Sequence, residues 1–295
     1  MVNKNFLLFF ILLVCSCNSG SSGNKSLISE QHNEQILNIN ATSSDSLIFN
    51  NLVNVFKDNN LDINELIISI GKYFIGTPYV ASTLDIEDEE RLIINLREMD
   101  CVTFVEYVTS LALCFTNKRY DFDDFAEILT VVRYQSGKIE SYLSRLHYFS
   151  HWLQDNRDKG ILDIISDSIG NAGFDNKTDF MSSNPHLYKQ LNDTVLIEKL
   201  KSIEQTISTH PLKYITKDHI KIIENEIKDG DIIALSSLIK GLDISHVGFA
   251  VRQNGNIHLL HASTTSKKVE ITSVPLYDYL KNRSNITGIL AGRIK

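Results

Sequence analysis

The chain has 295 residues, of which 43% are hydrophobic and 22% charged, as in an ordinary globular protein. That length can bury a full core, either as one large domain or as a core with a subdomain. The formal net charge of −7, with no basic stripe to contact phosphates, argues against a nucleic-acid-binding protein.

The first residues have the pattern of an export signal. Lys4 supplies a positive charge, and residues 6–14 form an apolar run of nine, too short to cross a bilayer but typical of a signal-peptide core. The Cys-Ser-Cys that follows resembles a bacterial lipobox, which predicts a signal peptide over residues 1–17 and a lipid on Cys17. A plain secretory signal is the alternative.

Residues 18–45 are rich in Ser, Asn and Gly, so we expect a flexible tether between the lipid and a folded domain at residues 46–295. Because Asn18 rather than Asp follows Cys17, the inner-membrane retention signal of some diderm bacteria is absent. We therefore expect an exported lipoprotein anchored to a membrane, at the periplasmic face of the outer membrane if the cell has one. We also expect a monomer.

Helical patterns come first in the folded part. Residues 47–56 are predicted to be helical, and Asp62 with Glu65 forms a capping-box pattern that opens a second helix, which Gly76 ends. An acidic loop at residues 85–90 then leads to a third helical stretch.

Asp100 and Cys101 begin that third helix, which is predicted to be central. Asp100 is a good N-cap, and the apolar residues after it form two adjoining stripes, which indicates a buried helix. Cys101 then lies at the positive end of the helix macrodipole, a position that favours the thiolate, the form that attacks carbonyl carbons. The alternative is that Cys101 is an ordinary buried core cysteine.

The cysteine spacing predicts a free thiol in the exported protein. Once the signal is removed and Cys17 is lipidated, Cys101 and Cys114 remain, thirteen positions apart along one predicted helix. With a rise of ~1.5 Å per residue their Cα atoms are about 20 Å apart, which is too far for a disulfide. We expect Cys114 to serve packing.

Beyond the central helix the pattern changes to strands. Residues 128–134 are predicted to be a strand and residues 195–207 an amphipathic helix. Further strands are predicted at residues 232–235, 245–252, 257–264, 269–271 and 288–294. Helices followed by antiparallel strands predict an α+β fold.

A hairpin in this region brings two histidines together. Asn254-Gly255 between apolar runs is a strong two-residue turn signal, and the register it sets pairs His261 with Gly248. Because side chains alternate along a strand, His246 and His261 then share one face and His258 points to the other. A histidine pair beside a buried thiol suits a cysteine nucleophile. The alternative is a pair of ordinary core or surface histidines.

These residues carry a resemblance to a known family. A cysteine opening a helix, with His-Val-Gly at residues 246–248 and Leu-His-Ala-Ser at residues 260–263, resembles the NlpC-type papain-like cysteine peptidases of bacterial cell walls. Additional motifs resemble a branch of N-acetylmuramoyl-L-alanine amidases first catalogued as a domain of unknown function. Those motifs lie at residues 76–79, 100–106, 144–148, 241–243 and 246–248. The match begins near Leu47 and includes a long insert at about residues 135–228.

The resemblance implies a papain-like core, with a central helix against an antiparallel sheet, and the catalytic set Cys101, His246 and His261. It also implies cleavage of the amide between the lactyl group of (anhydro-)N-acetylmuramic acid and L-alanine in peptidoglycan fragments, through a thioester. No metal or cofactor is implied. The Cys101 backbone N–H and the Tyr79 hydroxyl are candidate donors to the oxyanion.

Arg145 and His147, together with Tyr79, are the candidates for substrate binding, since arginine binds carboxylates in a bidentate manner. For Arg145 an ion pair with a structural Asp or Glu is an equal alternative. Two other functions stay open: a D-glutamyl-diamino-acid endopeptidase of the same fold, and a non-catalytic murein-binding lipoprotein.

Overall fold

The structure is a computed structural model that describes residues 38–174 and 177–295. The predicted signal peptide, the lipidation residue Cys17 and most of the tether lie outside the described residues. The described helices are α1 (Ser43–Phe56), α2 (Ile63–Tyr73), α3 (Cys101–Thr116), α4 (Phe122–Arg133), α5 (Phe149–Asp158), α6 (Ser166–Ile169), α7 (Phe180–Ser183), α8 (Thr194–Ser208), α9 (Lys217–Ile220) and α10 (Leu276–Lys281).

The described strands are β1 (Ile39–Asn40), β2 (Leu92–Ile93), β3 (Leu162–Asp163), β4 (Ala172–Phe174), β5 (Leu212–Thr216), β6 (Ile232–Ser236), β7 (Ile244–Gln253), β8 (Asn256–Ser263), β9 (Lys268–Ile271) and β10 (Gly288–Ile294). One antiparallel sheet has the order β4-β5-β10-β6-β7-β8-β9, with β3 also paired to β10. The α+β prediction is confirmed.

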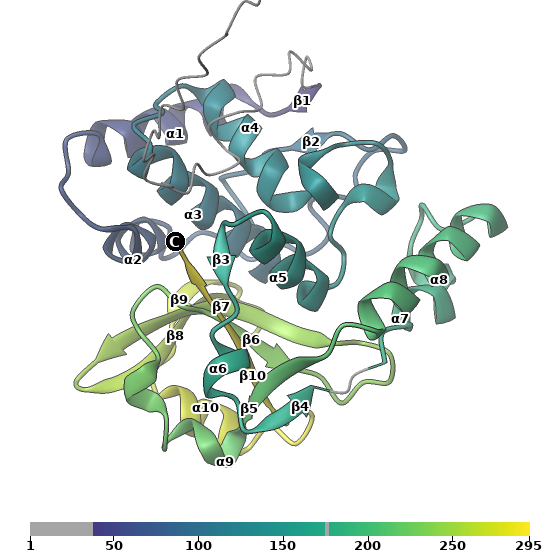
Figure 1. Cartoon of the computed structure of the whole chain (residues 1–295). Helices are drawn as coiled ribbons and strands as arrows, with labels where there is room; N and C mark the ends of the chain where they lie inside the picture. Colours follow the sequence, from purple (N-terminus) through teal and green to yellow (C-terminus); the bar gives the residue numbers. More distant parts are fainter. Residues whose placement is uncertain (1–37, 175–176) are drawn as a thin grey trace, which may run out of the picture.

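The sheet lies between two layers of helices. α1 to α5 cover one face, and the short helices α6, α9 and α10 lie on the other (Figure 1). Side chains of β6 alternate between the two layers. Ile232 and Ala234 are buried in the core under the long helices, whereas Ile233 and Leu235 are buried in the core under α9 and α10. A central strand that is apolar at every position therefore has both faces covered.

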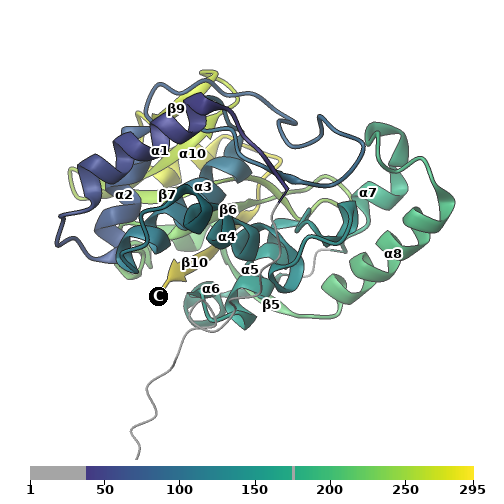
Figure 2. The same cartoon turned by 90° about the horizontal axis from the view of Figure 1, so that it is seen from above.

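The predicted insert supplies both an extension of the sheet and a separate helical lobe. Its strands β3, β4 and β5 add to the sheet beside β10. α7 and α8 project at the end of the molecule opposite α1 and α2 (Figure 2). Tyr148 joins this lobe to the body, since its hydroxyl donates to Glu204 of α8 at 2.6 Å.

Residues 128–134 are helical, so the predicted strand is wrong. They belong mostly to α4, whose buried Phe125, Ile128, Leu129 and Val132 recur at helical spacing. The β-branched side chains at the end of this segment suggested a strand, but the helix that begins after Asp121 continues through them. The packing of the whole amphipathic face outweighs the local strand preference.

The folded part begins earlier than the predicted boundary at residue 46. β1 pairs in parallel with β2, and the buried carboxylate of Asp45 accepts the Leu96 backbone N–H at 2.8 Å. Asp45 also caps α1, accepting the Thr42 backbone N–H at 2.8 Å. The polar residues that suggested a tether are thus helix-capping residues at this point in the chain.

Candidate active site

Cys101 is the first residue of α3, as predicted. The Asp100 carboxylate caps the helix by accepting the Thr103 backbone N–H at 2.8 Å. Every residue from Thr103 to Phe115 is buried, so α3 is the central helix, and Phe104 packs edge-on against Phe249 of β7 at 5.8 Å between ring centroids. Cys101 as a residue is half-buried, with its sulfur turned inward toward Val247 of β7, whereas Cys114 is fully buried.

The hairpin of β7 and β8 has the predicted register. Asn254 and Gly255 both have positive φ, at 50° and 87°, as a two-residue primed turn requires. Across the strands Phe249 pairs with Leu260, which continues the register toward Gly248 and His261.

The two predicted histidines meet on one face of this hairpin. The Nε2 atom of His246 lies 2.5 Å from the Nδ1 atom of His261, and the rings are nearly perpendicular. His258 points away, with its Nδ1 2.7 Å from the Thr272 carbonyl oxygen. The predicted placement of all three rings is confirmed.

Gly248 allows this close approach. A Cβ atom at that position would lie 2.7 Å from the Leu260 carbonyl oxygen and 2.8 Å from the Cβ of His261. A side chain there would push the two strands apart, and the imidazoles with them.

The thiol lies against β7, the strand that carries His246. The Val247 backbone N–H, one residue after His246, makes a hydrogen bond that lowers the Cys101 pKa, as do the N–H groups of Cys101 and Val102. Burial acts in the opposite direction and, together with the Asp100 carboxylate, raises the Cys101 pKa to about 12. The predicted preference for thiolate is therefore wrong for the resting site, because burial outweighs the helix terminus.

Both histidines are also neutral at pH 7. Burial, together with the neighbouring His261 and the positive charge of Arg283, lowers the pKa of His246 to about 3. Burial lowers the pKa of His261 to about 4, although the carboxylate of Glu270 acts against it. A neutral thiol needs a general base to remove its proton before or during any attack on a carbonyl carbon, and a neutral imidazole can serve as that base.

Two tyrosines border the thiol. Burial and the nearby Cys101 raise the pKa of Tyr79 to about 12, so its hydroxyl stays a hydrogen-bond donor. The ring centroids of Tyr279, on α10, and His261 lie 5.8 Å apart. The Arg283 guanidinium stacks on the Tyr279 ring, with 4.2 Å between its carbon and the ring centroid. Sequence reasoning missed Tyr279, Arg283 and Glu270, because no motif around them points to a site.

Arg145 and His147 make contacts within the protein itself. The guanidinium of Arg145 is 8% exposed and lies 2.7 Å from Asp85 and 3.3 Å from Glu90, both in the acidic loop. The Nε2 of His147 lies 2.7 Å from the Tyr142 carbonyl oxygen. These contacts favour the structural alternative for Arg145 that the sequence left open.

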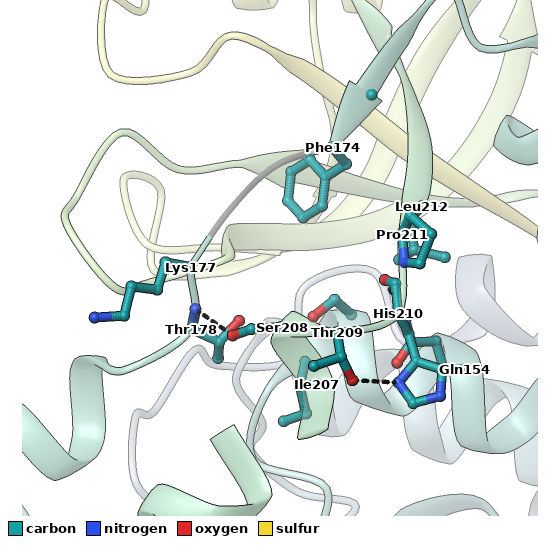
Figure 3. A pocket seen from close by; sticks show the side chains of 12 residues that line it. Gln154, Phe174, Lys177, Thr178, Ile207, Ser208, Thr209, His210, Pro211 and Leu212 are labelled. Carbon is teal, nitrogen blue, oxygen red and sulfur yellow. Dashed lines mark hydrogen bonds between the residues drawn. The ribbon is translucent and has the colours of Figure 1, made fainter. Parts of the chain in front are cut away.

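A cavity of about 480 Å³ lies apart from these residues, between α5, β4 and the C-terminal end of α8. Phe174, Gln154 and His210 line it, with Lys177 and Thr178 on the opposite side (Figure 3). Its walls come from the insert and include none of the candidate catalytic residues.

Within residues 38–174 and 177–295, no three or more His, Cys, Asp or Glu side chains are grouped so that they could hold a metal ion. In the same residues, no helix has the length and apolar character needed to cross a membrane.

Fold and site define an α+β protein in which a cysteine at a helix N-terminus lies against an antiparallel sheet that carries two paired histidines. The chain belongs to the N-acetylmuramoyl-L-alanine amidase-like family, whose model matches residues 69–289. No protein with a curated description matches the chain.

Solved structures agree with this family. An N-acetylmuramoyl-L-alanine amidase from Bacteroides uniformis is 37% identical, with a TM-score of 0.76 over 80% of this chain and 100% of that one. A Bacteroides fragilis protein named as a candidate xylanase is 40% identical, with a TM-score of 0.73 over 77% of this chain and 99% of that one. A Legionella pneumophila protein is 25% identical, with a TM-score of 0.62 over 85% of this chain and 94% of that one.

Proposed function

We propose that the chain is a cell-wall amidase that cleaves the amide between (anhydro-)N-acetylmuramic acid and L-alanine in murein fragments. The observation that carries this proposal is the position of Cys101 at the start of α3, with its thiol against β7, the strand that carries His246 of the hydrogen-bonded pair His246 and His261. The family and the amidase from Bacteroides uniformis support the reaction class.

In the proposed reaction His246 removes the thiol proton while the Cys101 sulfur attacks the lactyl carbonyl carbon. The backbone N–H of Cys101 and the hydroxyl of Tyr79 donate to the oxyanion that forms. His246 then protonates the departing amine of L-alanine, which leaves a thioester on Cys101. Finally His246 activates a water molecule that hydrolyses the thioester and releases the lactyl carboxylate.

The endopeptidase alternative differs only in which amide bond lies over Cys101, and a non-catalytic murein-binding protein would make no product. A xylanase cleaves a glycosidic bond, a reaction that glycosidases typically carry out with two carboxyl groups. At Cys101 the carboxylate that acts on the thiol is that of Asp100, and it already caps α3; the other groups acting there are backbone N–H groups. The surroundings of Cys101 therefore do not favour a glycosidase.

Digestion of a defined anhydro-muropeptide, with products identified by mass spectrometry, tests the proposal. We expect free anhydro-sugar and an intact stem peptide from the wild-type protein. Cys101→Ala should give no product but fold normally, because alanine suits the first turn of a helix. Cys114→Ala is the matched control and should remain active.

Three results would contradict the proposal. A shortened peptide still attached to the sugar means an endopeptidase, and a cleaved glycan means a glycosidase. Full activity in Cys101→Ala removes the cysteine from the mechanism.

A further inference from the structure

One buried nitrogen of the histidine pair has no hydrogen-bond partner among the described residues. His261 is 1% exposed, and its Nδ1 atom is occupied by His246 at 2.5 Å. Its Nε2 atom is buried, and no hydrogen-bond partner for it exists in the described part of the chain. A buried polar atom without a hydrogen-bond partner lowers the stability of the folded state, so the nearest group that could bond to this nitrogen needs to be identified.

The geometry of the pair decides which nitrogen must carry each proton. Because Nε2 of His246 contacts His261, only Nδ1 of His246 remains to accept the thiol proton. A neutral His246 with a free Nδ1 carries its proton on Nε2 and donates it to Nδ1 of His261. His261 must then carry its own proton on Nε2, the atom without a partner.

Glu270 is positioned to accept a hydrogen bond from the Nε2–H group of His261. It lies directly opposite His261 in the pairing of β8 with β9, and its Oε1 atom is 4.0 Å from Nε2 of His261. Its side chain is 32% exposed, so it has room to move closer. Arg283, just after α10, is the other charge that acts on His261; it is positive and cannot accept a hydrogen bond.

We propose that Glu270 is a positioning residue that holds His261 as its Nε2–H tautomer and thereby leaves Nδ1 of His246 free to accept the thiol proton. The inference rests on the proposed function and extends its Cys-His-His set by one carboxylate. No proton passes to Glu270. It acts through His261 and touches neither the sulfur nor the substrate.

The surroundings of the pair agree with this role. His261 faces His246 on β7, Glu270 on β9, Tyr279 on α10, and Arg283 just after α10. Burial lowers the pKa of His261, Glu270 raises it, and Arg283 lowers it further. Without Glu270, nothing in this set would favour a proton on Nε2 over one on Nδ1.

Kinetics of position-270 variants provide the first test. Carboxylates that orient metal-bound histidines contribute about 10- to 100-fold to activity, and we expect Glu270→Ala to lower kcat about tenfold with KM unchanged. Glu270→Gln should lose less, because the amide oxygen still accepts a hydrogen bond. Glu198→Gln makes the same change on the exposed surface of α8 and should have no effect.

The acid limb of kcat/KM separates this role from a merely structural one. Glu270 raises the pKa of His261, so removal of the Glu270 carboxylate should lower the pKa of His261. Through the hydrogen bond between the two rings it should also lower the pKa of His246. Since the base then stays unprotonated to lower pH, the limb should move to lower pH in Glu270→Gln. An unchanged kcat and an unmoved limb would overturn the proposal.

Nitrogen NMR of labelled histidines tests the tautomer without any substrate. We expect a proton on Nε2 of both His246 and His261 in the wild-type protein, and a shift of the His261 proton toward Nδ1 in Glu270→Ala. A wild-type His261 protonated on Nδ1 would overturn the inference. If the tautomers are as expected but no muropeptide is cleaved, the proposed function fails and the role of Glu270 in the pair stands.

Discussion

At Cys101 the local and tertiary electrostatic effects oppose each other. The start of α3 and three backbone N–H groups favour a thiolate, whereas burial and the Asp100 carboxylate favour the thiol. Burial is the larger effect and raises the Cys101 pKa to about 12. In the proposed reaction Cys101 would therefore depend on a general base at the moment of attack, which is the role proposed for His246.

The three hairpin histidines should differ sharply when replaced by alanine. His246→Ala should lower kcat by about 10³-fold, because it removes the proposed general base. His261→Ala should be about tenfold milder, since an orienting group contributes less than the base it orients. His258→Ala is the matched control: its ring bonds to the Thr272 carbonyl on the opposite face, so kcat should not change.

Initial rates on a defined anhydro-muropeptide, with unfolding curves for each variant, provide the measurement. A loss of kcat in His258→Ala as large as that in His246→Ala would show that the rates report stability and not chemistry.

Between elements, the acidic loop is held to the insert by Arg145. Its guanidinium is buried and binds Asp85 and Glu90, and it also stacks on Tyr142 with 5.0 Å between the guanidinium carbon and the ring centroid. These contacts join two segments that lie about sixty residues apart in the chain. A buried charge with two partners stabilises one arrangement of its elements, and removal leaves the partners uncompensated.

Arg145→Met should therefore act on stability more than on substrate affinity. We expect a loss of about 3 kcal/mol in the free energy of unfolding, the lower end for a broken buried ion pair, because Asp85 is partly exposed. Arg157→Met, which breaks an exposed pair with Asp158, should cost about 0.5 kcal/mol or less. Urea unfolding and KM are the measurements. A tenfold rise in KM without loss of stability would restore the substrate-binding role.

The close contact between β7 and β8 depends on the absence of a side chain at Gly248. Gly248→Ala should cost about 1–3 kcal/mol of unfolding free energy and impair catalysis, because the added Cβ meets Leu260 and His261 at under 3 Å. Gly173→Ala on β4 is the control, since a Cβ there meets nothing within 4 Å. Thermal unfolding of both variants is the measurement, and equal stability of the two would contradict the packing explanation.

For the whole molecule, a sheet buried on both faces supports the site, and the insert adds a helical lobe and strands beside it. We propose that this folded part is carried on a lipid anchor at Cys17, which lies outside the described residues. Several acyl chains together anchor a protein stably, whereas one binds a membrane only marginally. An anchored hydrolase would stay close to the wall and to released fragments.

Cys17→Ser tests the anchor. Fractionated cells should contain the wild-type protein in the membrane, in the outer membrane where the cell has one, and the variant in the soluble fraction. Incorporation of labelled palmitate into the wild-type protein alone would support the lipid directly. If both proteins are soluble, the lipobox interpretation is wrong and residues 6–14 belong to an ordinary secretory signal.

The sequence by itself determined the parts of the site whose geometry is local. Asp100 and the apolar stripes were enough to predict the start and burial of α3, since capping and helical periodicity act within a few residues. Asn254-Gly255 was enough to predict the hairpin register, because a two-residue turn and a period of two leave one pairing. His246 and His261 could therefore be placed together from sequence.

Only the tertiary structure decided the properties that depend on distant segments. The neutral thiol of Cys101 results from burial, the partners of Arg145 come from a loop far away in the chain, and Glu270 reaches His261 through the pairing of β8 with β9. Residues 128–134 became helical for the same reason: a shared buried face outweighed local preference. Burial and charge pairing depend on which segments meet in space, and no local pattern in a single sequence specifies that.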